Sequence, residues 1–328
     1  MRFGMFVPQG WRHDLVGIDP AEQWAAMSGL AAHADAGPWE SIWVYDHFHT
    51  VPVASEEATH EAWSLMSAFA ATTTRIRLGQ MCTCMSYRNP AYLAKIAATV
   101  DVISGGRVEM GIGAGWYEDE WRAYGYGFPQ PGERLARLDE GVQIMRQAWS
   151  TGSATLNGAH YRVDGAIVRP VPLQKGGIPI WIAGGGEKVT LRIAAKYADY
   201  TNFGGTADVF SEKSKLLRAH CTDVGTDFDA IVRSSNYSTV IAETESEVQD
   251  RLAAIEARWV PSLGAQKAAA YILEYGGAIG VGTPEQVIER LADLKSRGLG
   301  YAIHYFPEAA YDCSGIELFE RTVIPALQ

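Results

Sequence analysis

The residues best able to do chemistry in this sequence stand where short apolar runs end. Asp46 and His47 directly follow the run Ser41–Tyr45. An imidazole can gain or lose a proton near neutral pH, and a neighbouring carboxylate can fix its orientation, so this pair is a candidate for proton transfer. Neighbouring residues of an extended strand point to opposite sides, so both can serve one pocket only if the strand ends before Asp46. The alternative is a loop cap beside a surface histidine.

The stretch from Arg107 to Trp121 begins with strand-like alternation and then becomes rich in glycine. Gly111, Gly113 and Gly115 leave the backbone bare, so we expect another group to approach closely, and Trp116 favours a flat partner. The third glycine stands one place too early for the dinucleotide-binding fingerprint, and no apolar helix follows. A tight loop is the simpler alternative. We interpret the stretch as a strand whose end opens a cofactor pocket.

The run that follows the predicted strand over 76–79 contains soft, weakly polar side chains. Met81, Cys82 and Cys84 suit contact with a planar ring, although core filling explains them equally well. A redox thiol pair is disfavoured because no nearby base would lower a thiol pKa. The spacing of these two cysteines supplies at most two metal ligands, so we expect no metal site.

Three glycines, Gly184 to Gly186, precede a predicted helix. Bare N–H groups and the helix dipole attract phosphate at such a turn, although a plain connecting turn has the same composition. The lysine and hydroxyl residue of the ATP-binding loop motif are missing at the required spacing. The turn therefore predicts a phosphate contact without ATP hydrolysis.

The elements that must position these residues alternate between strand and helix along the chain. Helix starts are marked by Asp19-Pro20, by Asn89-Pro90 and by the capping box Thr283–Gln286. Eight strand–helix units predict an α/β fold, a (β/α)8 TIM barrel with insertions, and a doubly wound sheet is the weaker alternative. We expect one domain over 1–328, with excursions at about 151–174 and 243–278. The predicted strands are 3–7, 41–45, 76–79, 108–113, 178–183, 199–203, 231–241 and 301–306, and the predicted helices are 19–34, 60–72, 90–103, 132–149, 187–197, 207–224 and 283–297.

Composition excludes several classes of protein. The 328 residues are 47% hydrophobic, with a net charge of -10 and no basic cluster, which argues against nucleic-acid binding. No apolar run reaches the roughly 18 residues of a membrane span, and the first residues form no signal peptide, so we expect a cytoplasmic protein. The helix over 90–103 is apolar nearly all round, which predicts a partner subunit, most simply in a homodimer.

With these motifs in view, the chain resembles the bacterial luciferase-like family of flavin and deazaflavin oxidoreductases, in the branch that uses coenzyme F420. The resemblance covers almost the full length, and its motifs are specific in combination. They are Ser41–Phe48, Thr74–Gly79, Tyr87–Pro90, Ile103–Arg107 with Gly111–Trp116, and Gly184–Gly186. The beginning, Met1–Trp11, is similar to a mycobacterial-type subgroup whose substrate is unknown.

The resemblance implies a barrel that holds the deazaflavin ring at the carboxyl ends of its strands, usually as a homodimer packed through the early helices. It implies that Asp46 touches the cofactor and that His47 lies near the reacting ring face. It also implies a bulge or non-prolyl cis bond near Met81-Cys82, behind the ring. The expected cofactor contacts are Asp46, Met81, Cys82, Cys84, Ala114, Gly115, Trp116 and the phosphate-binding turn Gly184, Gly185 and Gly186, with His47 catalytic.

One position departs from the family's best-known reaction. Sugar-phosphate dehydrogenases of the family carry a glutamate where this chain has Trp116, which puts sugar-phosphate oxidation in doubt and suits a flat or hydrophobic substrate. The leading hypothesis is an F420-dependent oxidoreductase that moves a hydride between the deazaflavin C5 and a small organic substrate. The alternatives are an FMN-dependent monooxygenase on the same barrel and a non-catalytic protein that binds a flavin or deazaflavin.

Overall fold

The computed structural model describes residues 1–328, apart from the burial of Gly276. The chain divides into two compact units. The first unit comprises residues 1–61, 204–211 and 233–328, and the second comprises 62–203 and 212–232. Each unit holds four of the eight predicted strands, and the prediction of one domain over 1–328 stays a prediction.

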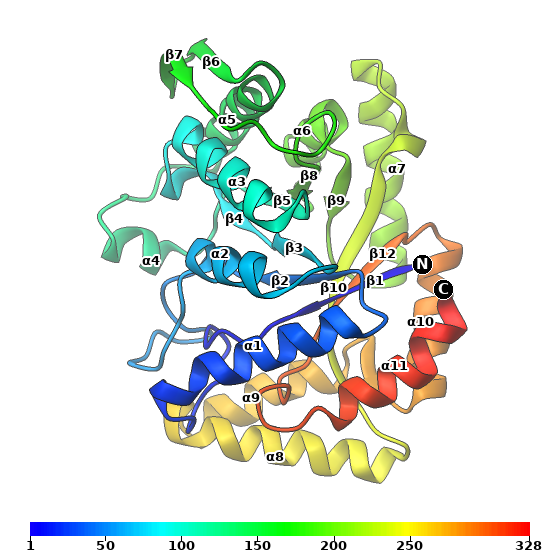
Figure 1. Ribbon diagram of the computed structural model, residues 1–328. Coiled ribbons are helices and arrows are strands. Elements are labelled where there is room, and N and C mark those ends of the chain that lie inside the picture. The colour runs from blue at the N-terminus through cyan, green and yellow to red at the C-terminus, as the bar shows by residue number, and fades with distance from the viewer. The chain divides into compact units, whose positions relative to one another are not determined.

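In the first unit, parallel strands lie in the order β11, β10, β12, β1, β2. Figure 1 shows α8 beside α9 and α10 beside α11, and contacts between these helix pairs agree. The strands are β1 (Arg2–Phe6), β2 (Ser41–Val44), β10 (Val232–Ile241), β11 (Gly280–Gly282) and β12 (Tyr301–Tyr305). The helices are α1 (Pro20–Ala36), α8 (Glu245–Leu263), α9 (Ala265–Gly276), α10 (Pro284–Ser296) and α11 (Ser314–Leu327).

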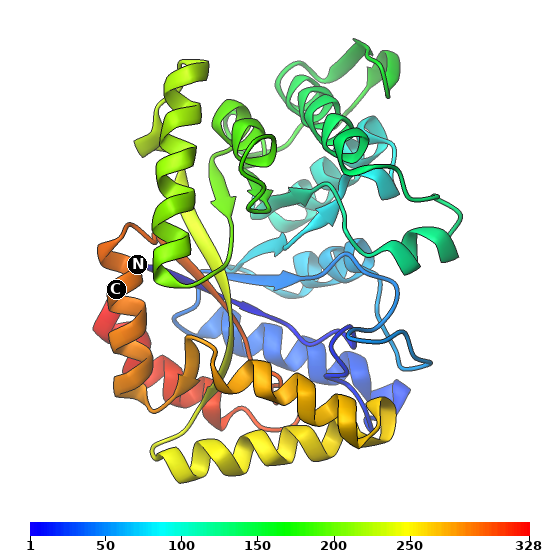
Figure 2. The same ribbon diagram turned by 180° about the vertical axis from the view of Figure 1, so that it is seen from behind.

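In the second unit, parallel strands lie in the order β3, β5, β8, β9, and β4 also pairs with β5. An antiparallel hairpin packs on α5, as Figure 2 shows from behind. The strands are β3 (Arg77–Gln80), β4 (Thr83–Cys84), β5 (Val108–Gly113), β8 (Ile180–Ala183), β9 (Tyr200–Asn202) and the hairpin β6 (Ser153–Asn157) with β7 (Arg162–Ile167). The helices are α2 (Ala62–Thr72), α3 (Pro90–Ser104), α4 (Glu118–Ala123), α5 (Pro131–Thr151) and α6 (Thr190–Tyr197). Helix α7 (Ala207–Val224) has residues in both units.

Local capping chemistry explains why the predicted starts of α1 and α3 are confirmed. The Asp19 carboxylate accepts a hydrogen bond from the Ala21 amide at 2.9 Å, and Asn89 does the same for Ala91 at 3.0 Å. At its end, α3 stops at Gly105, whose left-handed φ of 73° suits glycine. The hairpin and the helices α8 and α9 occupy the two predicted excursions.

Other boundaries differ from the prediction. Helix α2 begins at Ala62 rather than His60, because the His60 amide donates to the Gln9 carbonyl at 2.9 Å. Helix α6 begins at Thr190 rather than Glu187, after a turn, and no side chain caps it. The sequence analysis also missed α4, α11, β4 and β11, which are short or, for α11, lack a side-chain cap. Among the described residues, no helix is both long and apolar enough to cross a membrane.

The glycines of β5 pack against the segment that ends β3 and forms β4. A methyl group on Gly111 would collide with the Gln80 carbonyl oxygen, and one on Gly113 would lie 2.8 Å from Cys82 Sγ. At Gly115 it would meet Cys84 Sγ at 2.5 Å. The close partner expected at these glycines is therefore, on this side, the protein's own chain. The glycines allow β5 to approach a neighbouring segment that carries two sulfur atoms.

Replacing Gly113 by alanine should destabilise the protein, because the new methyl group overlaps Cys82 Sγ. We expect the free energy of unfolding in urea to fall by about 1 to 3 kcal/mol, the usual range for overpacking. The double variant with Cys82→Ala removes the sulfur and should recover most of that loss.

The matched control is Gly132→Ala in α5, where a methyl group meets nothing within 4 Å. Alanine is the better helix former, so this change should leave stability equal or raise it by up to about 1 kcal/mol. Strict additivity of Gly113→Ala and Cys82→Ala would show that the two side chains do not share this space.

Candidate active site

In the first unit, the candidate proton-transfer residue His47 lies just beyond the end of β2. The strand ends at Val44, so Asp46 and His47 are no longer held on opposite faces of a strand. Asp46 is buried, and His47 is half-buried. The imidazole stacks flat on the Trp11 indole, with ring centroids 4.2 Å apart and planes 1° apart. This stacking fixes the plane of the imidazole.

Gln9, which the sequence analysis did not single out, holds the end of β2 in place. Its buried carboxamide accepts a hydrogen bond from the Tyr45 amide at 2.5 Å and donates to the Tyr45 carbonyl at 2.8 Å. It also donates to the His60 carbonyl at 3.0 Å. One amide side chain thus satisfies backbone groups just before Asp46 and in the following loop. These partners are 36 and 51 residues away, so no local pattern could reveal them.

In the second unit, the peptide bond between Met81 and Cys82 is cis, which confirms the position expected from the resemblance. Met81 is buried, Cys82 is half-buried and Cys84 is buried. Thr83 donates a hydrogen bond to the Gln80 side chain at 2.6 Å, which ties together the residues on either side of the cis bond. The roles of Met81, Cys82 and Cys84 as cofactor contacts stay predictions.

The loop after β5 presents partly open backbone. Ala114 and Gly115 are half-buried, and Gly115 has a left-handed φ of 82°. Arg134, which is buried, donates a hydrogen bond to the Gly115 carbonyl, and its guanidinium lies 4.2 Å from the Phe128 ring centroid. An arginine from α5 therefore positions this backbone.

Trp116 projects from the same loop. Its side chain is 60% exposed and stacks on Tyr117, with centroids 5.2 Å apart. Tyr124 and Tyr126 nearby in sequence are also exposed. These rings offer apolar surface after β5.

The turn Gly184–Gly186 follows β8 in the same unit. Gly184 has a φ of 119° and donates its amide to the Asn202 carbonyl at 2.8 Å. Lys213 of α7 lies near Gly185 and pairs with Glu187 at 2.7 Å. The turn therefore has an ammonium group nearby that the sequence analysis missed, because Lys213 sits in the middle of a helix without a motif.

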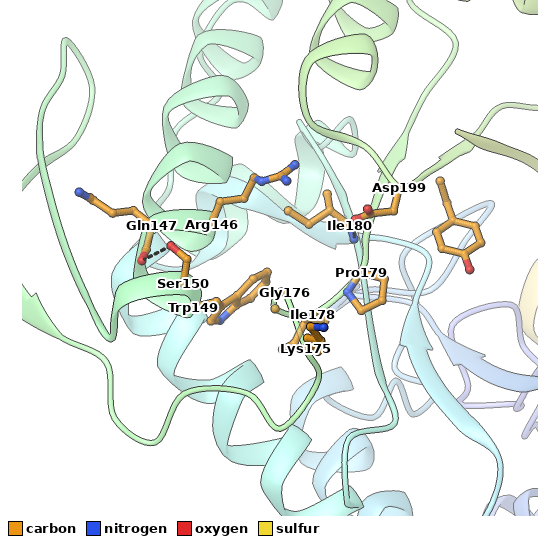
Figure 3. Close-up of a pocket in the computed structure, with 12 residues that line it drawn as sticks. Arg146, Gln147, Trp149, Ser150, Lys175, Gly176, Ile178, Pro179, Ile180 and Asp199 are labelled. Carbon is orange, nitrogen blue, oxygen red and sulfur yellow. Dashed lines mark hydrogen bonds between the residues drawn. The ribbon is translucent and has the colours of Figure 1, made fainter. Parts of the chain in front are cut away.

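A hollow of about 730 Å³ in the second unit lies at the amino ends of β8 and β9, opposite to the strand ends described above (Figure 3). Trp149, Lys175 and Asp199 are among the residues that line it, next to the beginnings of β8 and β9. Asp199 accepts a hydrogen bond from the Ile180 amide at 2.9 Å, so its carboxylate already holds β8. Active sites of this fold class lie at the carboxyl ends of the strands, so we do not assign the chemistry to this hollow.

His304 on β12 is a core residue. It is fully buried, its Nδ1 lies 2.8 Å from the Thr239 hydroxyl, and burial lowers its pKa to about 3. All four cysteines are free thiols. Among the described residues, no three histidine, cysteine or acidic side chains are grouped to hold a metal ion.

Solved structures with the same fold show the fold class. An F420-dependent secondary alcohol dehydrogenase in complex with an F420-acetone adduct superposes with a TM-score of 0.78 at 20% identity, over 100% of this chain and 99% of that one. Coenzyme F420-dependent tetrahydromethanopterin reductase from Methanopyrus kandleri has a TM-score of 0.77 at 19% identity, over 100% and 99% of the two chains. The fold is thus α/β, a (β/α)8 TIM barrel, as predicted.

Two curated relatives are similar in sequence. An F420-dependent glucose-6-phosphate dehydrogenase of Mycobacterium avium (strain 104) is 37% identical over 191 residues. That match covers 54% of this chain and only 52% of the relative, so the chain spans about half the length of that protein. The enzyme of the same name from Nocardia farcinica is 30% identical over 331 residues, which is 91% of this chain and 93% of the relative.

The family follows from a match that extends over most of the chain. The model of the luciferase-like monooxygenase family matches residues 1–300, which include the strand ends after β2, β3, β5 and β8. The chain therefore belongs to the luciferase-like monooxygenase family.

Proposed function

We propose that this protein is an F420-dependent oxidoreductase that acts on a small organic substrate. The observation that carries the proposal is the likeness, over nine-tenths of the chain, to a relative named as an F420-dependent dehydrogenase. The cis bond at Met81-Cys82 and the partly open backbone at Ala114-Gly115 support a ring-binding role for these strand ends.

The second unit offers residues that fit a ring with a phosphate-bearing tail. Cys82 is half-buried beside the buried and polarisable Met81 and Cys84, and the backbone at Ala114-Gly115 lacks bulky side chains. In the Gly184–Gly186 turn, the amides of Gly185 and Gly186 would hold the tail phosphate, since the Gly184 amide already donates to Asn202. Lys213, which also pairs with Glu187, would add a positive charge. In this proposal, Trp116 and Asp46 also contact the cofactor. When bound, F420 supplies hydride transfer at C5 of its ring.

His47 is the proposed acid–base group. Stacking on Trp11 restricts rotation of the imidazole, so its ring nitrogens face fixed directions. A group held in this way can give a proton to a substrate atom that receives a hydride, or take one in the reverse reaction. Asp46 would contribute charge beside it.

The substrate is proposed to have a flat or apolar part. Trp116 stands where the resemblance implies a glutamate in sugar-phosphate dehydrogenases. The exposed rings of Trp116, Tyr124 and Tyr126 present hydrophobic surface after β5. We therefore do not transfer glucose 6-phosphate oxidation from the relatives to this chain.

A flavin-dependent monooxygenase is the second candidate, because the matching family model is named for monooxygenases. A monooxygenase RslO1 from Streptomyces bottropensis also shares the fold, with a TM-score of 0.77 at 21% identity over 99% of both chains. The two candidates differ in the cofactor and in their need for oxygen.

Titration with F420 and with FMN under identical conditions distinguishes the two candidates. We expect F420 to bind at least about tenfold more tightly, a difference of about 1.4 kcal/mol, because the relative that carries the proposal is named as F420-dependent. Turnover should proceed without oxygen consumption. Tight FMN binding without F420 binding would exclude the leading proposal.

Replacing His47 by alanine should slow turnover of a substrate found by panel screening by roughly a hundredfold or more, the usual effect of losing an acid–base group. The affinity for F420 should change little, as measured by fluorescence titration. His160→Ala, at the exposed turn of the hairpin, is the matched control and should behave as wild type. Unchanged turnover of His47→Ala would remove this residue from the mechanism.

We also propose a homodimer through α3. Tyr92 and Ile103 on this helix are 61% and 48% exposed in the single chain, more than an apolar helix face normally leaves to solvent. The double variant Tyr92→Glu/Ile103→Glu should convert dimer to monomer by light scattering. Leu273→Glu on α9, which replaces a residue that is 77% exposed, should stay dimeric, and a monomeric wild type would refute the proposal.

A further inference from the structure

Arg12 is a charged residue of the first unit that the proposed mechanism does not use. It lies in the loop between β1 and α1, next to Trp11, whose indole stacks on His47. The residue is half-buried. A guanidinium partly removed from water normally has an acidic partner or a full set of hydrogen bonds.

Aromatic rings surround the Arg12 guanidinium. Its central carbon lies 5.1 Å from the Trp11 ring centroid, 5.4 Å from that of Tyr45 and 4.9 Å from that of Tyr305. Ring faces stabilise a cation electrostatically. A ring face offers no oxygen or nitrogen acceptor, so these contacts do not replace conventional hydrogen bonds to the N–H groups of the fork.

The protein provides very few acceptors for this guanidinium. Arginine carries five N–H donors, and here the one hydrogen bond is a long contact of 3.4 Å from Nη1 to the Tyr275 hydroxyl. Nε is buried and has no hydrogen-bond partner among the described residues. The indole Nε1 of Trp11, the neighbouring residue, is likewise buried without a partner in the described part of the chain.

Burial raises the pKa of the Asp14 carboxyl and the charge of Arg12 opposes this rise, but the Asp14 carboxylate forms no ion pair with the guanidinium. It accepts hydrogen bonds from the Gly10 amide at 2.6 Å and from the Tyr305 hydroxyl at 3.0 Å, one on each oxygen. Among the described residues, no acidic side chain lies within ion-pair distance of the guanidinium. The loop therefore presents a positive charge and unpaired donors that are already held in position.

We propose that Arg12 binds an oxyanion of the substrate, a carboxylate or a phosphate, and that the surrounding rings contact its flat or apolar body. Two oxygens of such a group match the planar fork of arginine. The assignment rests on the proposed function, because it gives the substrate class for the site in which His47 would act. The proposed substrates are therefore acidic, and neutral compounds of the same shape are not expected to be substrates.

The first experiment uses the cofactor-free protein and two probes of similar shape, benzoate and benzamide, with inorganic phosphate as a third. Calorimetry should detect binding of benzoate or phosphate, and benzamide should bind at least tenfold more weakly. Arg12→Gln should weaken binding of the anion by about tenfold to hundredfold, the range for hydrogen bonds to a charged group. Arg12→Lys keeps the charge without the fork and should fall in between.

Arg321→Gln is the matched control, since Arg321 lies in the same unit on α11 and pairs with Glu243 at 2.9 Å. It should bind the anions as wild type does. Equal binding of benzoate and benzamide, no anion binding, or unchanged binding by Arg12→Gln would overturn the proposal. If circular dichroism shows that Arg12→Gln does not fold, anion binding by Arg12→Lys is compared with that of the wild type instead. Equal binding by these two proteins would then overturn the proposal.

The oxyanion that Arg12 binds could also belong to the tail of the cofactor. The wild-type protein and Arg12→Gln are therefore both titrated with F420. Retained F420 affinity in Arg12→Gln supports the substrate assignment, whereas a loss equal to that for the anion probes overturns it. The anion assay contains no cofactor, so its failure is independent of whether F420 or FMN binds the wild-type protein.

Discussion

The close approach of β5 to the segment from Gln80 to Cys84 is the constraint on which the second unit's candidate site depends. The approach requires glycine at positions 111, 113 and 115, because a side chain there would occupy the space of a carbonyl oxygen or of a cysteine sulfur. Arg134 then holds the Gly115 carbonyl, so the backbone beyond β5 has one defined path. Site residues of this unit are thus positioned mainly by close backbone packing, and the Arg134 hydrogen bond adds to it.

The first unit uses polar contacts for the same task. The Gln9 carboxamide bonds the backbone of Tyr45 in both directions, and this anchors the chain just before the Asp46-His47 pair. A buried amide with both its oxygen and nitrogen satisfied is specific, because apolar substitutes would leave the Tyr45 N–H and C=O groups unpaired. The flat stack of Trp11 on His47 depends on this loop geometry.

Much of the fold could be predicted from the sequence because its signals are local. Proline after an aspartate or asparagine marked α1 and α3, and alternation marked β5, since caps and period-two patterns are properties of a few adjacent residues. The prediction failed for α11, which has no side-chain cap. The fold class was predicted from the count of strand–helix repeats along the chain.

The candidate site was only partly predictable, for a physical reason. Strand ends identified His47 and the turn at Gly184, but Gln9 and Lys213 act through partners distant in sequence. The glycine stretch was interpreted as a surface for a flat ligand, and the structure adds that the chain's own sulfur atoms fill the space beside two of its glycines. A glycine-rich backbone predicts that another group approaches closely, but it does not distinguish a ligand from another segment of the same chain.

The pairing of Gly113 with Cys82 and of Gly115 with Cys84 also constrains how this sequence can diverge. A larger residue at either glycine is compatible with the fold only when the facing cysteine position becomes smaller or its side chain turns away. Among close homologues, a substitution at Gly113 or Gly115 should therefore be accompanied by a substitution at the cysteine position that faces it. Covariation between positions 82 and 113 would then trace the shape of the strand end even where the chemistry of the site has changed.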